Sequence, residues 1–305
     1  MIIRRIKYPD IDFIKYAECV ENSAQRKYTA TSLFLDVITG KNWQLLVWED
    51  YKAVMPFYTI KKMGIEFVVT PFLCQQLGVF SREDRPQIND AFLQYLSRNF
   101  NVKSYAFNDR NQFSDKRNTR KNYILFSEDY ETVYKRYSPT RRKRIKQNPD
   151  IKRESFVSEA VDFTVAEAFI RQNSKGYGDK EQVQKVIGIY KALYKAKKLH
   201  LYGFFYRDSL INLITAYEES KTIALLGTFN DASFVKLNGA SVLNDEIIKR
   251  FVGHKDIDFE GSEVPSIEEF FRGFRPRLMP YPHLLNTNRD LIRIFIKRVG
   301  NFTIK

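Results

Sequence analysis

The chain has 305 residues, of which 44% are hydrophobic and 15% aromatic, a composition that is typical of folded proteins and excludes a largely disordered chain. This length exceeds what one hydrophobic core usually supports, so two domains are expected. The formal net charge of +14, from 50 Lys and Arg against 36 Asp and Glu, favours anionic partners such as phosphates, nucleic acid or acidic glycan precursors.

The start of the chain, MIIRRIKYPD, carries charges where a secretory apolar segment would lie, and later apolar stretches are interrupted by charged, proline or glutamine residues. We therefore expect a cytoplasmic protein without a membrane span. Cys19 and Cys74 are far apart and have no CxxC partner, which fits a reducing compartment. Both are expected to be small buried residues rather than nucleophiles.

Apolar periodicity predicts the same order of elements in both halves of the chain. In the first half the pattern predicts a helix over 11–23, a three-strand meander over 43–70, a helix over 86–99 and a strand over 102–108. In the second half it predicts helices over 165–174 and 182–197, a meander over 201–228, a helix over 241–251 and a strand over 255–261.

The two meanders share a register. WQLLVWEDYKAVMPFYTIKKMGIEFVVT begins at Trp43, and LYGFFYRDSLINLITAYEESKTIALLGT begins at Leu201. Asp50 aligns with Asp208 without a gap, although identities are few. The shared register indicates an internal duplication, and thus two domains of similar fold.

In the second half, the strands 222–228 and 256–260 are joined by a predicted helix. This is the pattern of two parallel neighbours connected by a right-handed crossover. Ligands of such sheets bind at the carboxyl ends of the strands. The stretch DFEGSEVPSIEEFFRGF, which begins at Asp258, is therefore expected to lie at a binding site.

A basic helix is predicted between the two halves, within SPTRRKRIKQNP. Ser138 followed by Pro139 is typical of a helix start, and Asn148 before Pro149 of a helix end. Because its basic side chains point to nearly every side, the helix is expected to lie outside the core. It is either a solvated linker or a phosphate site in which Arg141 and Arg142 take part.

Two carboxylates mark the last strand. Ile257 and Phe259 alternate with Asp258 and Glu260, which would put both carboxylates on one face about 7 Å apart. Such a pair could accept a proton from an attacking amine. The alternative is a structural role, in which the carboxylates cap helices or pair with nearby arginines.

The residues after this strand predict a rigid turn and a short helix. Gly261 and Ser262 allow a sharp turn, and Ser266 with Glu269 forms a capping-box pattern for a helix that ends at Gly273. The phenylalanines at 270, 271 and 274 are expected to be core residues.

Several common enzyme classes lack their sequence signatures here. The histidines 200, 254 and 283 have no metal-ligand spacing, and no GxSxG, P-loop or dinucleotide motif occurs. Hydrolase, kinase and dehydrogenase functions are therefore not expected, and no metal site is expected. Tyr281 could protonate a leaving group if its segment folds back over the site, although a structural role is the alternative.

The order of elements, the SPTRRKRIKQ helix and the DFEGSEVPSIEEFFRGF stretch together resemble the Fem family of peptidoglycan-bridge aminoacyltransferases and the GNAT-type, cellulose-biosynthesis-associated acetyltransferases. The resemblance implies an α/β fold of two tandem GNAT-like domains, each a mixed, mostly antiparallel sheet flanked by helices. The expected ranges are 1–137, a junction helix over 138–150, and 151–305 with the active site.

The resemblance also implies an activity, namely N-acyl transfer. The donor would be acyl-CoA, such as acetyl-CoA, or aminoacyl-tRNA, used as a co-substrate without metal. The acceptor would be an amine of a phosphate-bearing molecule or a cell-wall precursor, and tRNA would be a further partner.

The donor loop departs from the GNAT pattern R/Q-x-x-G-x-G/A. The best match is KLNGAS, in which a basic first residue and Gly239 agree with the pattern. A helix start still offers amide donors to phosphate. The poor match keeps open a second hypothesis, a catalytically degenerate tandem GNAT protein that binds a ligand or partner without chemistry. A nucleic-acid-binding protein is a third.

The candidate site residues fall into three groups. The catalytic candidates are Glu260, Asp258 and Tyr281. The donor-phosphate candidates are Lys236, Asn238, Gly239 and Ser241. The candidates for binding the acceptor or a phosphate are Arg141, Arg142, Ser262 and Arg275.

Overall fold

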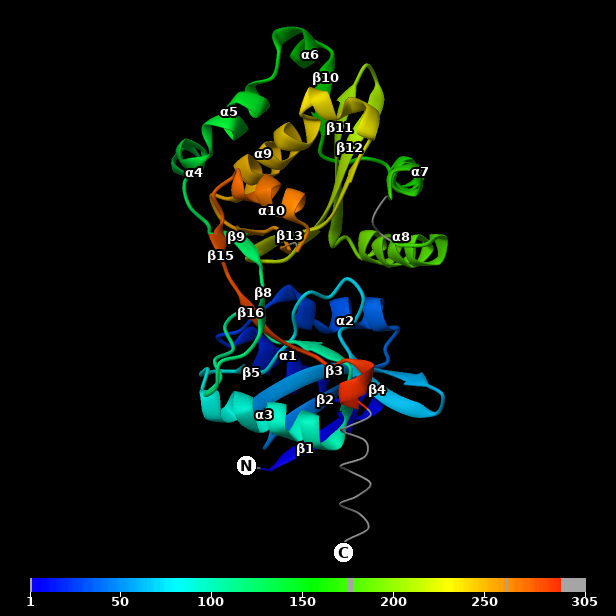
Figure 1. Ribbon diagram of the computed structural model, residues 1–305, viewed down its shortest axis with the longest axis vertical. Coiled ribbons are helices and arrows are strands. Elements are labelled where there is room, and N and C mark those ends of the chain that lie inside the picture. The colour runs from blue at the N-terminus through cyan, green and yellow to red at the C-terminus, as the bar shows by residue number, and fades with distance from the viewer. Residues whose placement is uncertain (1, 175–177, 262, 292–305) are drawn as a thin grey trace, which may run out of the picture. The chain divides into compact units, whose positions relative to one another are not determined.

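The computed structural model describes residues 2–174, 178–261 and 263–291 (Figure 1). The chain forms two compact units. The first consists of Met1–Arg120 and the chain from Pro280 onward, and the second of Lys121–Met279.

The first unit contains two sheets and the helices packed on them. Its elements are β1 (Ile3–Lys7), η1 (Tyr8–Asp10), α1 (Phe13–Glu21), η2 (Tyr28–Ala30), α2 (Ser32–Thr39), β2 (Trp43–Trp48), β3 (Ala53–Lys62), β4 (Ile65–Val69), β5 (Phe80–Ser81), α3 (Pro86–Asn99), β6 (Asn101–Val102), β7 (Ser104–Ala106), β8 (Thr119–Arg120) and β16 (Tyr281–Leu285). The larger sheet has the order β1-β2-β3-β4-β6, with β5 paired to β3, and the smaller sheet has the order β7-β16-β8.

The second unit is built on one long sheet. Its elements are β9 (Tyr123–Leu125), α4 (Tyr130–Arg136), α5 (Pro139–Lys146), α6 (Pro149–Arg153), β10 (Ser155–Ser158), α7 (Phe163–Asn173), α8 (Lys180–Lys195), β11 (Leu199–Tyr206), β12 (Ser209–Glu218), β13 (Thr222–Asn230), η3 (Ala232–Leu237), α9 (Gly239–Phe251), β14 (Asp256–Asp258), α10 (Pro265–Arg272) and β15 (Arg277–Leu278). The strand order is β10-β11-β12-β13-β14-β9-β15.

Helices cover both faces of this sheet, with α9 and α10 on one side and α7 and α8 on the other (Figure 1). The central strand β12 is accordingly buried along most of its length, from Ile211 to Tyr217, and it reads as a nearly continuous apolar run. Phe271 and Phe274 join the core of this unit, as the sequence predicts, whereas Phe270 is partly buried at its edge.

Both predicted meanders are present. The strands β2, β3 and β4 pair antiparallel in sequence order, as do β11, β12 and β13. Asp50 and Asp208 both lie in the turn that joins the first two strands. Each meander is followed by a helix and a parallel strand, β6 against β4 and β14 against β13. The predicted parallel pairing of the two strands joined by α9 is therefore confirmed.

The compact units differ from the predicted domain ranges. Residues 121–137, expected in the first domain, belong to the second unit because β9 pairs with β14 and β15. The chain from Pro280, expected in the second domain, belongs to the first unit because β16 pairs with β7 and β8. These strands have five residues or fewer, and their pairing has no local sequence signal.

Neither cysteine forms a disulfide bond within the described part of the chain. Cys74 is buried and Cys19 is partly buried, and burial raises the pKa of the Cys19 thiol to about 11. A thiol so shifted is a poor nucleophile at neutral pH, in agreement with the expectation from the sequence.

Within the described residues, no helix combines the length and the apolar character that crossing a bilayer requires.

A buried asparagine cluster fixes the segment between β4 and β5. The side chain of Asn111 accepts a hydrogen bond from the Val79 N–H at 3.0 Å and donates one to the Val79 carbonyl at 2.9 Å. Asn108 donates to the Gln25 carbonyl at 2.7 Å. Gly78 lies against this cluster with φ of +114°, and a Cβ there would collide with the Asn111 side-chain oxygen and the Asn108 backbone.

We predict that Gly78→Ala lowers the free energy of unfolding by about 3 kcal/mol, because it adds backbone strain to the loss of buried hydrogen bonds. Gly64→Ala is the matched control: Gly64 also has a positive φ, of +78°, but a Cβ there meets nothing within 4 Å. The control should lose about 1 kcal/mol. Urea unfolding measures both, and equal losses would contradict the account of the cluster.

In the second unit, Asp245 of α9 is a buried carboxyl that faces α4. The Tyr130 hydroxyl donates to both of its oxygens, at 3.1 and 3.0 Å. Burial raises the pKa of Asp245 to about 6, and the hydrogen bond from Tyr130 opposes part of that shift.

A raised folded-state pKa means that the folded protein binds the Asp245 proton more tightly than the unfolded chain does. The stabilising contribution is complete below about pH 4 and is lost as the pH rises through about 6. We predict that the stability of Asp245→Asn, relative to the unmodified protein, increases by about 2–3 kcal/mol between pH 4 and pH 7. Urea unfolding across this range measures it, and a difference that stays constant with pH would refute the shift.

Candidate active site

Two cavities adjoin in the second unit. The first, here called the α9 cavity, has a volume of about 620 Å³ and lies where the N-terminus of α9 meets the ends of β12 and β13. It is lined by Arg144, Asn212, Thr228, Asn230, Val235, Lys236, Asn238, Gly239, Ala240, Ser241, Ser266, Ile267, Phe270 and Phe271. All four predicted donor-phosphate residues therefore lie together at one cavity.

The N-terminus of α9 is open to an anionic ligand. Asn238 precedes the helix with a left-handed backbone, φ of +59°, and makes no side-chain cap. Its amide group donates instead to the Lys236 carbonyl at 3.2 Å. The partial positive charge and the amide donors of the helix start are thus not taken up by a capping side chain of Asn238.

Gly239 allows α9 to approach the sheet closely. A Cβ at this position would collide with the side-chain oxygen of Asn212 and with the ring of Phe204. Asn212 and Phe204 lie on β12 and β11. The absence of a side chain at Gly239 therefore sets where the helix start lies against these two strands.

Asn212 was not predicted as a site residue. Its side chain is 5% exposed, and its amide group donates to the Asn230 side-chain oxygen at 2.7 Å. The Asn212 oxygen is buried and has no hydrogen-bond partner among the described residues. An asparagine inside the apolar run LINLI is the signal that could have drawn attention to it.

The second cavity, here called the arginine cavity, has a volume of about 420 Å³ and lies between α5 and α10. Four guanidinium groups line it, those of Arg141, Arg144, Arg272 and Arg275. The lining also includes one carboxylate, that of Glu269. Arg275, a predicted site residue, is therefore at this cavity, whereas Arg144 and Arg272 were missed because a charged surface helix gives no sign of which side faces a cavity.

Arg141 is buried, which corrects the expectation that the junction helix lies wholly outside the core. The helix begins as predicted, with the Ser138 hydroxyl accepting from the Arg141 N–H at 3.2 Å. The Arg141 side chain, however, is part of a residue only 3% exposed. Burial lowers the pKa of Arg141 to about 10, and the nearby Arg144 adds to that effect.

Two hydrogen bonds and two aromatic rings hold the Arg141 guanidinium. Nη1 donates to the Ser241 hydroxyl and Nη2 donates to the Phe270 carbonyl at 2.6 Å. The guanidinium carbon lies 4.0 Å from the ring centre of Phe270 and 4.4 Å from that of Phe274, which is cation–π geometry. Since the Ser241 hydroxyl receives this hydrogen bond, it contributes to the site through Arg141.

Arg142 points elsewhere. It lines a separate hollow with Tyr134, Pro139, Lys143, Lys146 and Gln147. The structure therefore separates the predicted pair Arg141 and Arg142, and brings Arg141 together with Arg144, one turn further along α5.

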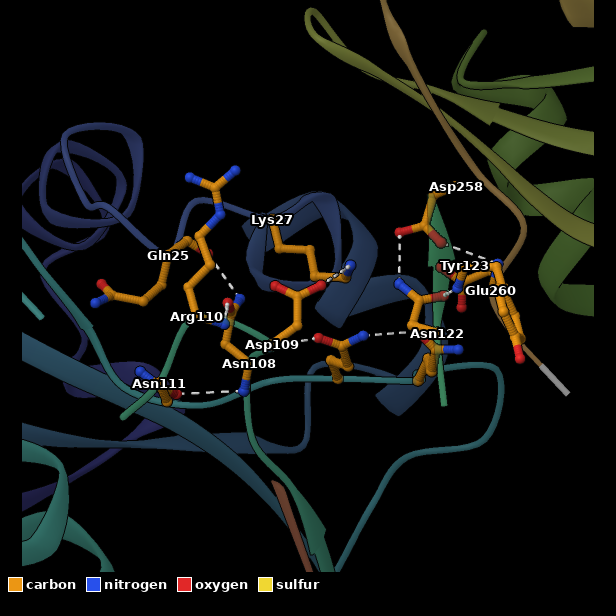
Figure 2. A network of polar contacts seen from close by, with 12 residues as sticks. Gln25, Lys27, Asn108, Asp109, Arg110, Asn111, Asn122, Tyr123, Asp258 and Glu260 are labelled. Atoms are coloured by element: carbon orange, nitrogen blue, oxygen red, sulfur yellow. Dashed lines mark hydrogen bonds and ion pairs between the residues drawn. The ribbon is translucent and has the colours of Figure 1, made fainter. Parts of the chain in front are cut away.

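The corner after β14 differs from the predicted extended strand. The strand ends at Asp258, and Glu260 has a left-handed backbone with φ of +59°. The two carboxylates therefore do not occupy one face of a continuous strand. Instead, the Asp258 carboxylate, which is 1% exposed, accepts from the Glu260 N–H at 2.9 Å and from the Asn122 amide group at 3.4 Å (Figure 2).

Close backbone packing supports this corner. Gly261 has φ of +61°, and a Cβ there would collide with the Lys121 carbonyl. Glu268 of α10 accepts hydrogen bonds from the Tyr123 hydroxyl, at 2.6 Å, and from the Lys121 ammonium group, at 2.8 Å, and these partners lower the pKa of Glu268. The corner and the start of α10 are thus both attached to the chain segment around β9.

The start of α10 is not capped as predicted. The helix begins at Pro265 after Val264, and Ser266 lies inside its first turn, where it lines both cavities. Proline at the first helical position sets this start. The predicted site residue Ser262 lies outside the described residues.

Two of the predicted catalytic residues belong to the second unit and one does not. Asp258 and Glu260 form the corner just described, and neither is among the described residues that line the two cavities. Glu260 is half-buried. Tyr281 belongs to the first unit, where β16 pairs it with Arg120 of β8.

No protein-family model matches this chain. A comparison with curated proteins also gives no match. Solved structures do match. The match to the crystal structure of FemX spans 96% of this chain and 99% of FemX, with a TM-score of 0.66 and 9% sequence identity.

Two further structures match over most of their length. A domain named as the C-terminal domain of a lysylphosphatidylglycerol synthetase from Agrobacterium fabrum has a TM-score of 0.52 at 12% identity, and covers 93% of this chain and 97% of its own. A tandem GNAT protein of the clavulanic acid biosynthesis pathway has a TM-score of 0.51 at 8% identity, and the match spans 92% of this chain and 97% of that protein. The chain therefore has the tandem GNAT fold that these structures share, as the sequence resemblance implied.

Proposed function

We propose that the protein is an N-acyltransferase that moves an acyl or aminoacyl group from an activated donor to an amine. The observation that carries this proposal is the α9 cavity, which lies at an uncapped helix N-terminus beside the carboxyl end of β13. Open sheets with parallel neighbours bind ligands at this place. The tandem GNAT fold supports the same reaction class by analogy.

The donor would bind with its phosphate groups at the start of α9. Lys236 is exposed at the cavity and supplies a positive charge, and the first-turn amides supply hydrogen-bond donors. An acyl-CoA offers a pyrophosphate, and an aminoacyl-tRNA offers phosphodiesters. Both donor types therefore fit this arrangement of charges.

In the transfer step the neutral amine nitrogen attacks the acyl carbon. A nitrogen–carbon bond forms, and the bond to the donor's sulfur or oxygen breaks. The amine loses one proton to a base, and the leaving group takes up one proton. The proposed base is Glu260, which follows the carboxyl end of β14. Because Glu260 lines neither cavity, the proton would reach it through water.

Asp258 takes a different proposed role, because its carboxylate already accepts a hydrogen bond from the Glu260 N–H. We propose that it positions Glu260 instead of accepting the proton itself. Tyr281 has no role in the proposed step, because it belongs to the first unit.

For the acceptor we propose an amine on a phosphate-bearing molecule, such as a cell-wall precursor. The excess of guanidinium groups at the arginine cavity supports an anionic acceptor. The competing hypothesis, a degenerate tandem GNAT protein that binds without chemistry, predicts saturable donor binding with no transfer to any amine.

We predict that Glu260→Gln lowers the single-turnover rate by about 10²–10⁴-fold while the protein stays folded, because glutamine keeps the shape of the side chain and removes the base. The rate is measured with acetyl-CoA or aminoacyl-tRNA, whichever binds, and the melting temperature is measured on the same sample. Asp258→Asn should lower the melting temperature more and the rate less. A stable and fully active Glu260→Gln variant would remove Glu260 from the mechanism.

A second prediction concerns the start of α9. Lys236→Gln should weaken coenzyme A binding about five- to tenfold, since it removes one positive charge near the donor phosphates. Lys249→Gln, in the last turn of the same helix, removes the same charge at the other end and should leave the affinity within twofold. Isothermal titration calorimetry measures both, and equal effects of the two changes would place the coenzyme A phosphates away from the start of α9.

A further inference from the structure

We propose that the arginine cavity binds a phosphate group of a ligand whose less polar part extends into the α9 cavity. The extension into the α9 cavity rests on the proposed function. The anion site itself rests on the arginine cavity alone, and it is tested separately below.

Charge balance is the first support. None of the four guanidinium groups that line this cavity forms an ion pair among the described residues, whereas other arginines of the unit do: Arg171 pairs with Glu167 and Arg207 with Glu154. The single carboxylate in the lining, that of Glu269, leaves a net charge of about three positive units on this small surface. An anionic ligand with more than one charge would relieve the repulsion between these groups.

The second support is a built element inside the cavity. Arg141 is 97% buried, with two of its nitrogens fixed by Ser241 and the Phe270 carbonyl. Its third nitrogen, Nε, is buried and has no hydrogen-bond partner among the described residues. A buried guanidinium that is held in one orientation and keeps an unused donor is a pre-organised recognition group.

Gly273 packs closely against this edge of Arg141. A Cβ at Gly273 would lie 2.8 Å from Nε and 3.0 Å from Nη2 of Arg141. Gly273 has an ordinary helical backbone, with φ of −60°, so conformation does not require glycine here. The close approach to the guanidinium is therefore the physical reason for a residue without a side chain at this position.

The donor chemistry favours phosphate over a carboxylate. The hydroxyl groups of Ser138, Thr140 and Ser266 line the cavity together with the planar guanidinium forks. A phosphate group presents three or more oxygens to such donors, and it carries close to two charges as a monoester. A carboxylate offers two oxygens and one charge.

The two cavities share a wall, which indicates one ligand. Arg144, Ser266 and Phe270 belong to the lining of both. The α9 cavity adds apolar surface from Ile267, Phe271 and other side chains. A phosphate ester fits this pair of cavities, because its phosphate would lie in the cationic arginine cavity and its uncharged or apolar part in the more apolar α9 cavity.

The test uses inorganic pyrophosphate as the probe and the full chain. We expect saturable binding, and we expect the double variant Arg144→Gln, Arg272→Gln to weaken it at least about tenfold. Both arginines are exposed, so the fold should persist, which the melting temperature checks. Arg142→Gln is the matched control on the same helix: it lines a different hollow and should change the affinity less than about twofold.

A third variant probes the buried group. Gly273→Ala should weaken pyrophosphate binding and also lower the melting temperature, because the added methyl group would displace the Arg141 guanidinium from its hydrogen bonds. The proposal is overturned if the unmodified protein shows no saturable pyrophosphate binding, or if Arg142→Gln weakens binding as much as the double variant does.

Coenzyme A and uridine diphosphate, titrated against the unmodified protein and the double variant, identify the source of the phosphate. A loss confined to coenzyme A assigns the cavity to the donor, and a loss confined to uridine diphosphate assigns it to the acceptor. If neither ligand loses affinity, the ligand does not span the two cavities. Because binding is measured without turnover, a protein that binds pyrophosphate at the arginines but transfers no acyl group would retain this site and refute the proposed function.

Discussion

The candidate site depends on the burial of one positive charge, that of Arg141. This side chain joins three helices: it starts on α5, donates to Ser241 on α9 and donates to the Phe270 carbonyl on α10. Removing a guanidinium from water costs several kcal/mol, so the contact persists only because hydrogen bonds and two aromatic rings replace the lost water. The positions of α5, α9 and α10, and with them the walls of both cavities, follow from this contact.

The same contact explains why a poor match to the GNAT donor loop does not by itself remove a donor site. The loop pattern supplies glycines that let the backbone approach phosphate, whereas here Gly239 lies against Asn212 and Phe204 of the sheet. The hydroxyl of Ser241, two residues later, is turned to Arg141. Arginines of α5 and α10 line the same pair of cavities. The neighbouring helices therefore supply positive charge in addition to that of the KLNGAS loop.

The sequence predicted those parts of the fold whose signals are local. Helix α3 has the predicted bounds because Pro86 fixes its first turn, and the two meanders are present because their apolar runs and turns repeat along the chain. The burial of Arg141 could not be predicted, because the rings of Phe270 and Phe274 that cover it lie about 130 positions away in the sequence. A three-residue strand such as β9 also could not be predicted, since its pairing with β14 depends on the tertiary fold.

The corner at Glu260 differs from the extended strand that the sequence predicted, and this difference separates the roles of its two carboxylates. In an extended strand, Asp258 and Glu260 would be equivalent side chains on one face, and nothing would distinguish the two carboxylates. The left-handed backbone at Glu260 removes that equivalence, because the Asp258 carboxylate accepts a hydrogen bond from the Glu260 N–H. Asp258 is 1% exposed, whereas Glu260 is half-buried, so Glu260 is the more accessible carboxylate of the two. Its left-handed backbone is supported by the hydrogen bond to Asp258 and by the close approach of Gly261 to the Lys121 carbonyl.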